Sequence, residues 1–139
     1  MNVSPTITPI RLATFVALLN AFVSTGFAIA GIISPQAIVP AGVGVNEAAS
    51  VFALYAAART VPILAFVVWA VARRNVQALL LLGCLMGVIQ FFDGIAGIIS
   101  HDPSKVIGPW LIASVQAVSV LWLSRRPGDS VTQPQGAPS

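Results

Sequence analysis

Charge is what this sequence has least of. Asp, Glu, Lys and Arg together make up only 8% of its 139 residues, whereas an average soluble domain has about 25%. Hydrophobic residues make up 57%, and the mean hydropathy is +0.91. So few charges cannot cover a water-exposed surface. The sequence therefore excludes a soluble globular domain and predicts an integral membrane protein.

Cysteine and histidine are almost absent too, with Cys84 and His101 the single example of each. One cysteine cannot form a disulfide within the chain, and one Cys with one His cannot supply a typical zinc or haem-pair ligand set. The sequence also has no phosphate-binding glycine loop and no nucleophile elbow. The one lysine, Lys105, lies at the very start of the last apolar segment, at the membrane surface, which excludes a retinal Schiff base. We therefore expect no metal site and no cofactor.

Apolar segments fill most of the chain, and the predicted spans are 9–33, 47–72, 76–99 and 103–124. Each is long enough, at about 1.5 Å per residue, to cross a hydrocarbon core roughly 30 Å thick. Helix-start signals precede three of them, namely Thr8-Pro9, Asn46-Glu47 and Asp102-Pro103. We predict an all-α fold, a four-helix transmembrane bundle over residues 9–126, with a short N-terminal tail (1–8) and a disordered C-terminal tail (127–139).

The first segment has an alternative interpretation as a cleaved signal peptide. Ala28-Ile29-Ala30 resembles a signal-peptidase site after an apolar stretch. The apolar run continues through Ile33, and its full length favours a membrane span instead.

The basic residues predict the topology. Four of the seven form the pairs Arg73-Arg74 and Arg125-Arg126 at the ends of apolar spans. Under the positive-inside rule, these pairs and Arg11 lie on the cytoplasmic side. The helices then run up-down-up-down with both termini cytoplasmic, and the bacterial inner (plasma) membrane is the expected location. The net charge of +3 is thus explained by topology, and we expect no nucleic-acid partner.

Two ionisable residues, Arg59 and Asp93, lie deep inside apolar spans, where each charge costs roughly 2.5–3.5 kcal/mol. At 1.5 Å per residue, Arg59 lies about 21 Å and Asp93 about 27 Å above the 73–75 turn. Tyr55 and Gln90 fall in the same layer, spaced i,i+4 from Arg59 and i,i+3 from Asp93 respectively. We expect an Arg59 to Asp93 ion pair with Tyr55 and Gln90 as hydrogen-bond neighbours.

The pair admits a structural and a functional interpretation. A buried ion pair can merely hold two helices in register. Ionisable residues inside a membrane span are, however, usually functional. We therefore predict that the pair forms the polar centre of a binding site for a lipophilic small molecule, in a protein whose other partners are membrane lipids. The ligand-binding candidates are Tyr55, Arg59, Gln90, Asp93, Asn20 and Gln116. For the last two, hydrogen bonds between helices, made with Ser24 and Ser119, are an adequate explanation.

An enzyme built from these residues would use proton transfer without a cofactor, as in isomerisation, cyclisation or epoxide opening. Asp93 or Glu47 would act as acid or base, with Arg59 and Tyr55 stabilising charge. Glu47 is equally explained by the positive end of the helix that it opens.

Four glycines and Gln90 lie on one stripe of the third span. The glycines are Gly83, Gly87, Gly94 and Gly97. Spacings of three and four residues predict a face for close helix packing. A homo-oligomer through Gly83, Gly87 and Gly94 would use this face, as would an accessory or assembly subunit of a membrane complex. A third hypothesis is a small proton-coupled transporter that acts as a dimer, with Asp93 coupling the protons.

The Tyr55-x-x-x-Arg59 motif, the short basic turn and the late Asp93 together resemble the DoxX-like group of small four-helix bacterial integral membrane proteins. The resemblance covers residues 53–126. It implies a four-helix bundle and no single activity, although some members are similar to subunits of membrane oxidoreductases. Pro62 stands here where many relatives have a glycine, so the local helix shape is expected to differ.

Overall fold

The computed structural model describes residues 8–37, 39 and 44–125, and the regular structure in this part of the chain is entirely helical. The elements are α1 (Pro9–Ile33), the short 3-10 helix η1 (Pro35–Ala37), α2 (Glu47–Ala72), α3 (Val76–Ile99) and α4 (Ser104–Ser124). The four α-helices are long and apolar enough to cross a membrane. The predicted four-helix membrane bundle is confirmed at this level. The predicted tails lie outside the described residues, apart from Thr8.

The helix bounds coincide with the predicted ranges except that α4 begins at Ser104 instead of Pro103. The carboxylate of Asp102 accepts hydrogen bonds from the backbone N–H and the hydroxyl of Ser104, at 3.2 and 2.6 Å. The Ser104 hydrogen bond, followed by that from Lys105, holds the pKa of Asp102 below its usual value. The N-cap of α4 is Pro103, which makes no side-chain cap hydrogen bond, so the prediction of Asp102 as the N-cap was wrong by one residue. Asp102 instead holds Ser104, the first residue of the helix, from the preceding position.

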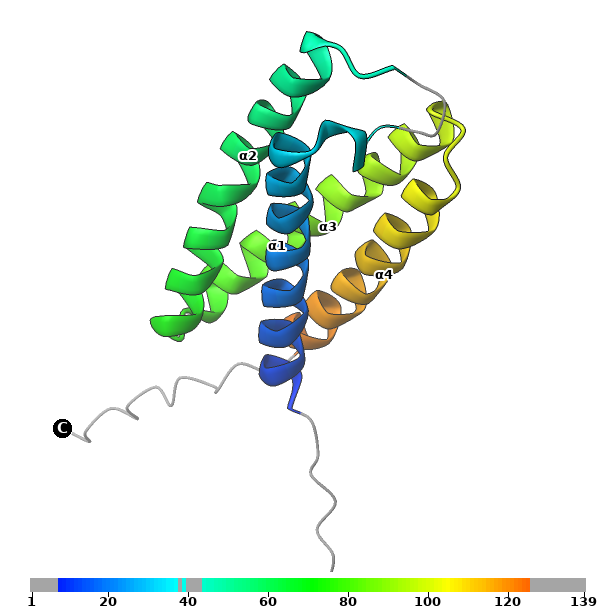
Figure 1. Cartoon of the computed structure of the whole chain (residues 1–139). Helices are drawn as coiled ribbons and strands as arrows, with labels where there is room; N and C mark the ends of the chain where they lie inside the picture. Colours follow the sequence, from blue (N-terminus) through cyan, green and yellow to red (C-terminus); the bar gives the residue numbers. More distant parts are fainter. Residues whose placement is uncertain (1–7, 38, 40–43, 126–139) are drawn as a thin grey trace, which may run out of the picture.

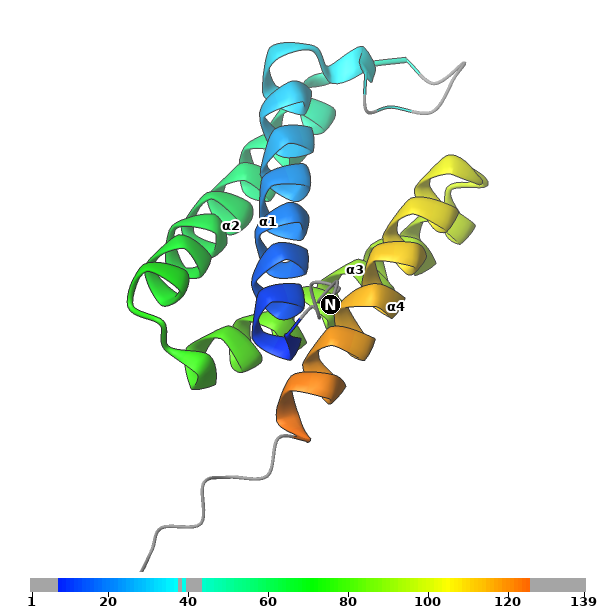
Figure 2. The same ribbon diagram turned by 90° about the horizontal axis from the view of Figure 1, so that it is seen from below.

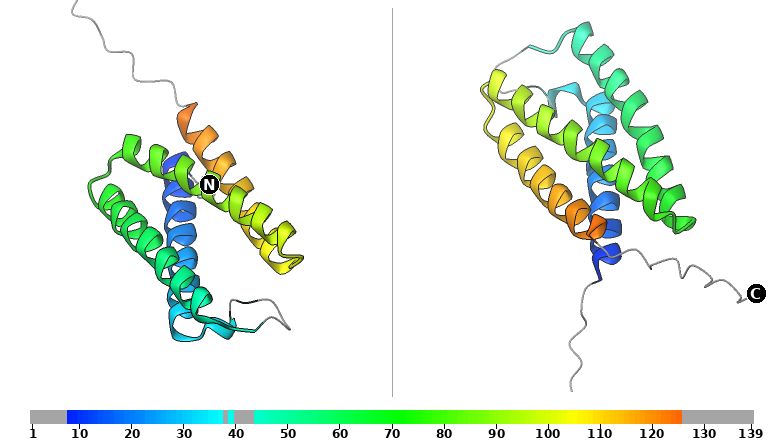
Figure 3. Two further views of the ribbon diagram at one scale, coloured as in Figure 1. Left: turned by 90° about the horizontal axis from the view of Figure 1, so that it is seen from above. Right: turned by 180° about the vertical axis from the view of Figure 1, so that it is seen from behind.

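The helices are arranged around α1, which stands between α2 on one side and α4 on the other (Figures 1 and 2). Helix α3 leaves the turn after α2, crosses α1 obliquely and then runs alongside α4. Seen from behind (Figure 3, right), α2 and α3 meet at residues 73–75 and diverge from there, with α1 behind them. One side of the molecule is thus formed by two helices that touch mainly near their shared turn.

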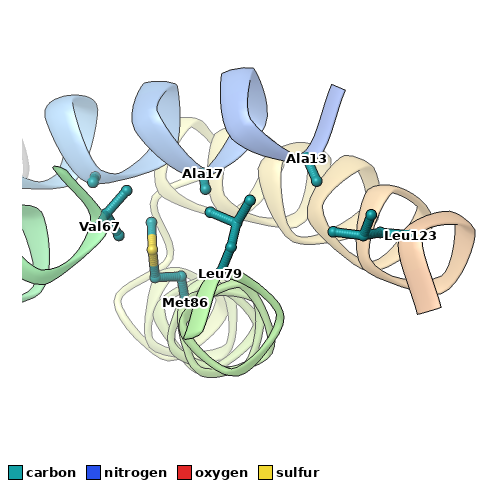
Figure 4. Close-up of a cluster of buried hydrophobic side chains, with 7 residues drawn as sticks. Ala13, Ala17, Val67, Leu79, Met86 and Leu123 are labelled. Atoms are coloured by element: carbon teal, nitrogen blue, oxygen red, sulfur yellow. The ribbon is translucent and has the colours of Figure 1, made fainter. Parts of the chain in front are cut away.

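An apolar core joins all four helices near the ends that carry the arginines. Figure 4 shows side chains from each helix pointing toward one another, and the labelled ones are Ala13, Ala17, Val67, Leu79, Met86 and Leu123. All are buried. The alanines on α1 let its backbone approach the other helices closely, which favours packing in a membrane.

The glycine face of α3 packs against α4 of the same chain. A Cβ at Gly83 would lie 2.8 Å from side-chain atoms of Gln116 and Val120. A Cβ at Gly94 would overlap the indole ring of Trp110, whose Nε1 donates a hydrogen bond to the Phe91 carbonyl at 3.2 Å. The predicted close packing is confirmed, with α4 as the neighbour. A homo-oligomer through these glycines stays a prediction, and a partner would have to reach them past α4.

Replacing Gly97 by alanine should destabilise the bundle, whereas the same change at Gly108 should not. The new Cβ at position 97 would lie 2.5 Å from the backbone oxygen of Lys105, and backbone cannot rotate aside, so α3 and α4 would separate there. Overpacking of this kind costs about 1–3 kcal/mol. At position 108 the Cβ would meet no described atom within 4 Å. Reversible unfolding in mixed micelles measures both variants, and equal stabilities would contradict the packing described.

Candidate functional site

The centre of the bundle holds a hydrogen-bonded cluster of neutral polar side chains. Asn20 on α1, Gln90 on α3 and Gln116 on α4 are 1%, 5% and 1% exposed. Gln90 Nε2 donates to Asn20 Oδ1 at 2.6 Å and to the Ser24 hydroxyl at 3.0 Å. Asn20 Nδ2 donates to Gln116 Oε1 at 3.5 Å. We call these four residues the amide cluster; it links three helices.

The cluster follows from local sequence positions. Asn20 and Ser24 are four residues apart and so share a face of α1, where the Ser24 hydroxyl donates to Asn20 Oδ1 at 3.3 Å. Gln90 lies on the glycine stripe of α3, which faces α4. The predicted hydrogen bonds between helices are therefore confirmed for Asn20 and Gln116. Ser119 is different, because its hydroxyl donates to the Gln116 carbonyl of its own helix at 2.8 Å.

The predicted Arg59 to Asp93 ion pair is present, but on the outside of the bundle. Arg59 Nη2 lies 3.9 Å from Asp93 Oδ1, and the two side chains are 52% and 45% exposed. Neither side chain forms a hydrogen bond with any residue in the described part of the chain. The pair bridges α2 and α3, the two helices that diverge from their shared turn (Figure 3, right). We call it the lateral pair, because it lies at the side of the bundle.

The other predicted members of this site lie elsewhere. Gln90 turns into the amide cluster, and Tyr55 is 70% exposed without a hydrogen bond to a described residue. The expectation that these two would be hydrogen-bond neighbours of the pair was wrong. Glu47, in the first turn of α2, lies about 18 Å along the helix from Arg59, so the structure does not bring it to Asp93.

A further contact between helices was not anticipated from the sequence. Thr25 Oγ1 on α1 donates to the carbonyl oxygen of Thr60 on α2 at 3.3 Å. A backbone carbonyl has two lone pairs, so this oxygen can accept from Thr25 in addition to a donor within its own helix. The sequence signal for this contact is that Thr25 directly follows Ser24, so that a second hydroxyl lies next to the amide cluster on α1.

The space beside the pair is small. A cavity of about 20 Å³ lies between α1, α2 and α3, and its polar lining residues are Asn20, Ser24, Arg59, Thr60 and Gln90. This volume suits about one water molecule, whereas pockets for small molecules are typically about 300–1,000 Å³. An enclosed chamber for a lipophilic ligand is therefore not formed beside Arg59 in the described part of the chain.

A larger space of about 500 Å³ lies against α3 and α4 and shares no lining residue with the small cavity. Its walls are small and apolar residues such as Gly87, Ala113 and Ala117, with Cys84 and Ser114 as the polar members. It contains neither residue of the ion pair. Within the described residues, no three His, Cys, Asp or Glu side chains gather where they could hold a metal ion.

Comparison with known proteins leaves the family open, because no protein-family model, no curated protein and no solved structure matches the chain. The resemblance to the DoxX-like group stays a prediction.

Substitution of Asn20 by leucine, which has a similar size, should destabilise the bundle. It leaves Gln116 Oε1 without its partner and Gln90 Nε2 with only Ser24, and an unsatisfied buried polar group costs roughly 1–3 kcal/mol. Ser114→Ala is the matched control, because that hydroxyl is exposed and bonds only to the Trp110 carbonyl of its own helix. Unfolding in mixed micelles compares them. An Asn20→Leu protein as stable as the Ser114→Ala protein would refute the importance of the cluster.

Proposed function

We propose that this chain is a non-catalytic assembly subunit, which associates with protein inside the membrane through the side of α2 and α3 that carries Arg59 and Asp93. The observation that carries the proposal is the half exposure of both charges on the outside of the bundle. A site for chemistry on a bound substrate would enclose its charges, whereas about half of each of these side chains is exposed on the outside of the bundle.

The energetic argument concerns what surrounds the pair. A charge at the centre of the membrane costs roughly 2.5–3.5 kcal/mol on insertion scales, which is an upper bound for these two charges, about 21 and 27 Å above the 73–75 turn. At 3.9 Å the two side chains compensate each other only in part, and lipid tails offer neither a donor nor an acceptor. A protein surface with polar groups at the same depth supplies both, so association relieves a cost that the isolated chain bears.

We further propose that the helices cross the membrane up-down-up-down, with both termini in the cytoplasm of a bacterial cell. The turn of residues 73–75 is too short to cross the bilayer, so α2 and α3 must be antiparallel. Arg11 lies in the first turn of α1 and Arg125 directly follows α4. This topology collects Arg11, Arg73, Arg74 and Arg125 on one side, as the positive-inside rule requires.

Binding of a lipophilic small molecule is the second candidate. It is supported by the position of Arg59, which belongs both to the lateral pair with Asp93 and to the lining of the inner cavity. The polar head group of a ligand that enters from the bilayer would therefore contact Arg59 first. If that molecule reacts, Asp93 is the residue for proton transfer, with Arg59 and Tyr55 stabilising charge. A DoxX-like relationship is compatible with either candidate.

The mass of the wild-type particle, released in mild detergent and measured by native mass spectrometry, tests the first candidate. We expect it to exceed one chain, and the neutral variant Arg59→Met/Asp93→Leu to run as a single chain. Phe15→Ala, which alters a 64% exposed side chain on α1, is the control and should match the wild type. A wild-type particle that is one chain carrying a small molecule, lost in the neutral variant, would instead establish the second candidate.

A further inference from the structure

We infer that the partner at Arg59 and Asp93 is a second copy of this chain, related to the first by a two-fold axis along the membrane normal. The inference rests on the proposed assembly function and specifies its partner. It is carried by the position and the signs of the two charges, one positive and one negative, on a single side of the bundle.

Depth is the first requirement for such a dimer. Two copies inserted with the same topology are related by rotation about the membrane normal, so residues that pair between them must lie at equal depth. Arg59 and Asp93 satisfy this requirement closely, because charged atoms 3.9 Å apart within one chain cannot differ in depth by more than that distance. Either charge can therefore contact the opposite charge of the other copy without tilting the bundle.

The order of the charges is the second requirement. Arg59 comes from α2 and Asp93 from α3, so the pair reaches from one helix to the other on the exposed side of the bundle. Rotation by 180° about an axis in front of that surface places the other copy's Asp93 opposite Arg59, and its Arg59 opposite Asp93. The resulting ring of four alternating charges is neutral. A self-complementary surface of this kind is what a two-fold interface requires.

Unused hydrogen-bonding capacity is the third requirement. Neither side chain bonds to a described residue, although a guanidinium offers five N–H donors and a carboxylate accepts at both oxygens. Arg–carboxylate pairs are strongest when two parallel hydrogen bonds form. The 3.9 Å separation in one chain leaves that geometry open for the second copy.

The surroundings of the pair fit a protein interface. On α2, Phe52, Tyr55 and Phe66 share the face of Arg59 by helical spacing and are 71%, 70% and 60% exposed. On α3, Phe92 is 61% exposed beside Asp93. Aromatic side chains and arginine are enriched in the centres of protein interfaces, and here exposed aromatic residues share the face of Arg59 on α2 and adjoin Asp93 along α3.

Charge complementation tests the inference with two differently tagged variants, Arg59→Asp and Asp93→Arg. Each variant alone places like charges opposite each other, both within a chain and between copies, and should lose self-association by at least about tenfold, since like-charge contacts cost several kcal/mol. Expressed together, the Arg59→Asp chain presents two acids to the two arginines of the Asp93→Arg chain. We expect the two tags to copurify from native-lipid nanodiscs as the wild-type chains do.

A second measurement does not depend on the folding of the charge variants. In a Cys84→Ala background, Tyr55→Cys should be linked to the same residue of a second copy by a bifunctional maleimide in native membranes. Phe15→Cys on α1, which is similarly exposed, should not be linked. The Arg59→Met/Asp93→Leu change in the Tyr55→Cys chain should abolish the link.

The outcomes separate the dimer from the broader proposal. A wild-type particle that contains one copy and a different protein, with no link at Tyr55→Cys, would overturn the dimer and leave the assembly function standing. A particle of one chain only, in detergent and in nanodiscs, would overturn both. A wild-type dimer whose mixed charge variants associate no better than either variant alone would place the contact elsewhere and refute the role of the pair.

Discussion

The hydrogen bond between Gln90 and Asn20 is the interaction on which the rest of the bundle depends. Hydrocarbon offers no partner to a polar side chain, so an amide inside a membrane helix must find one on another helix. Asn20 Oδ1 accepts a hydrogen bond from Gln90 Nε2 at 2.6 Å, and Asn20 Nδ2 donates one to Gln116 Oε1 at 3.5 Å. Together with the contact from Thr25 to the Thr60 carbonyl, this makes α1 the helix through which the other three are held.

Small residues make those hydrogen bonds geometrically possible. Gly83 and Gly87 leave room for the side chain of Gln116, so α4 comes close enough to α3 for that amide to reach α1. Alanines on α1 have the same effect near the arginine-bearing ends, where Leu79 and Val67 pack against Ala17 (Figure 4). Apolar packing and hydrogen bonding are therefore linked, since Gly83 and Gly87 admit the Gln116 side chain, whose Oε1 accepts the hydrogen bond from Asn20.

Much of this was predictable from the sequence, for physical reasons. Hydropathy and capping residues determine where a membrane helix begins and ends, so Asn46 marks the start of α2 correctly. Asn75 caps α3 in the same way, although the sequence predicted it only as part of the turn. The short turn at 73–75 fixes the relative depth of α2 and α3, which is why counting turns brought Arg59 to Asp93. Helix rotation is different, because it depends on neighbouring helices that spacing alone does not identify. Gln90 and Asp93 were assigned to one site, yet the packing of the glycine stripe turns Gln90 inward and leaves Asp93 at the surface.

The division between a neutral interior and a charged exterior also bears on mechanism. An amide can be buried when its hydrogen bonds are made, whereas a buried ion pair seldom regains the solvation that both charges lose. Between the amide cluster and the arginine-bearing ends, the described side chains that meet at the centre are apolar, among them Ala17, Val67 and Leu79. A proton taken up at Asp93 would meet this layer before reaching the other side, so the transporter hypothesis, which stays a prediction, requires a second conformation. The proposed partner in the plane of the membrane would account for charges that the neutral interior does not use.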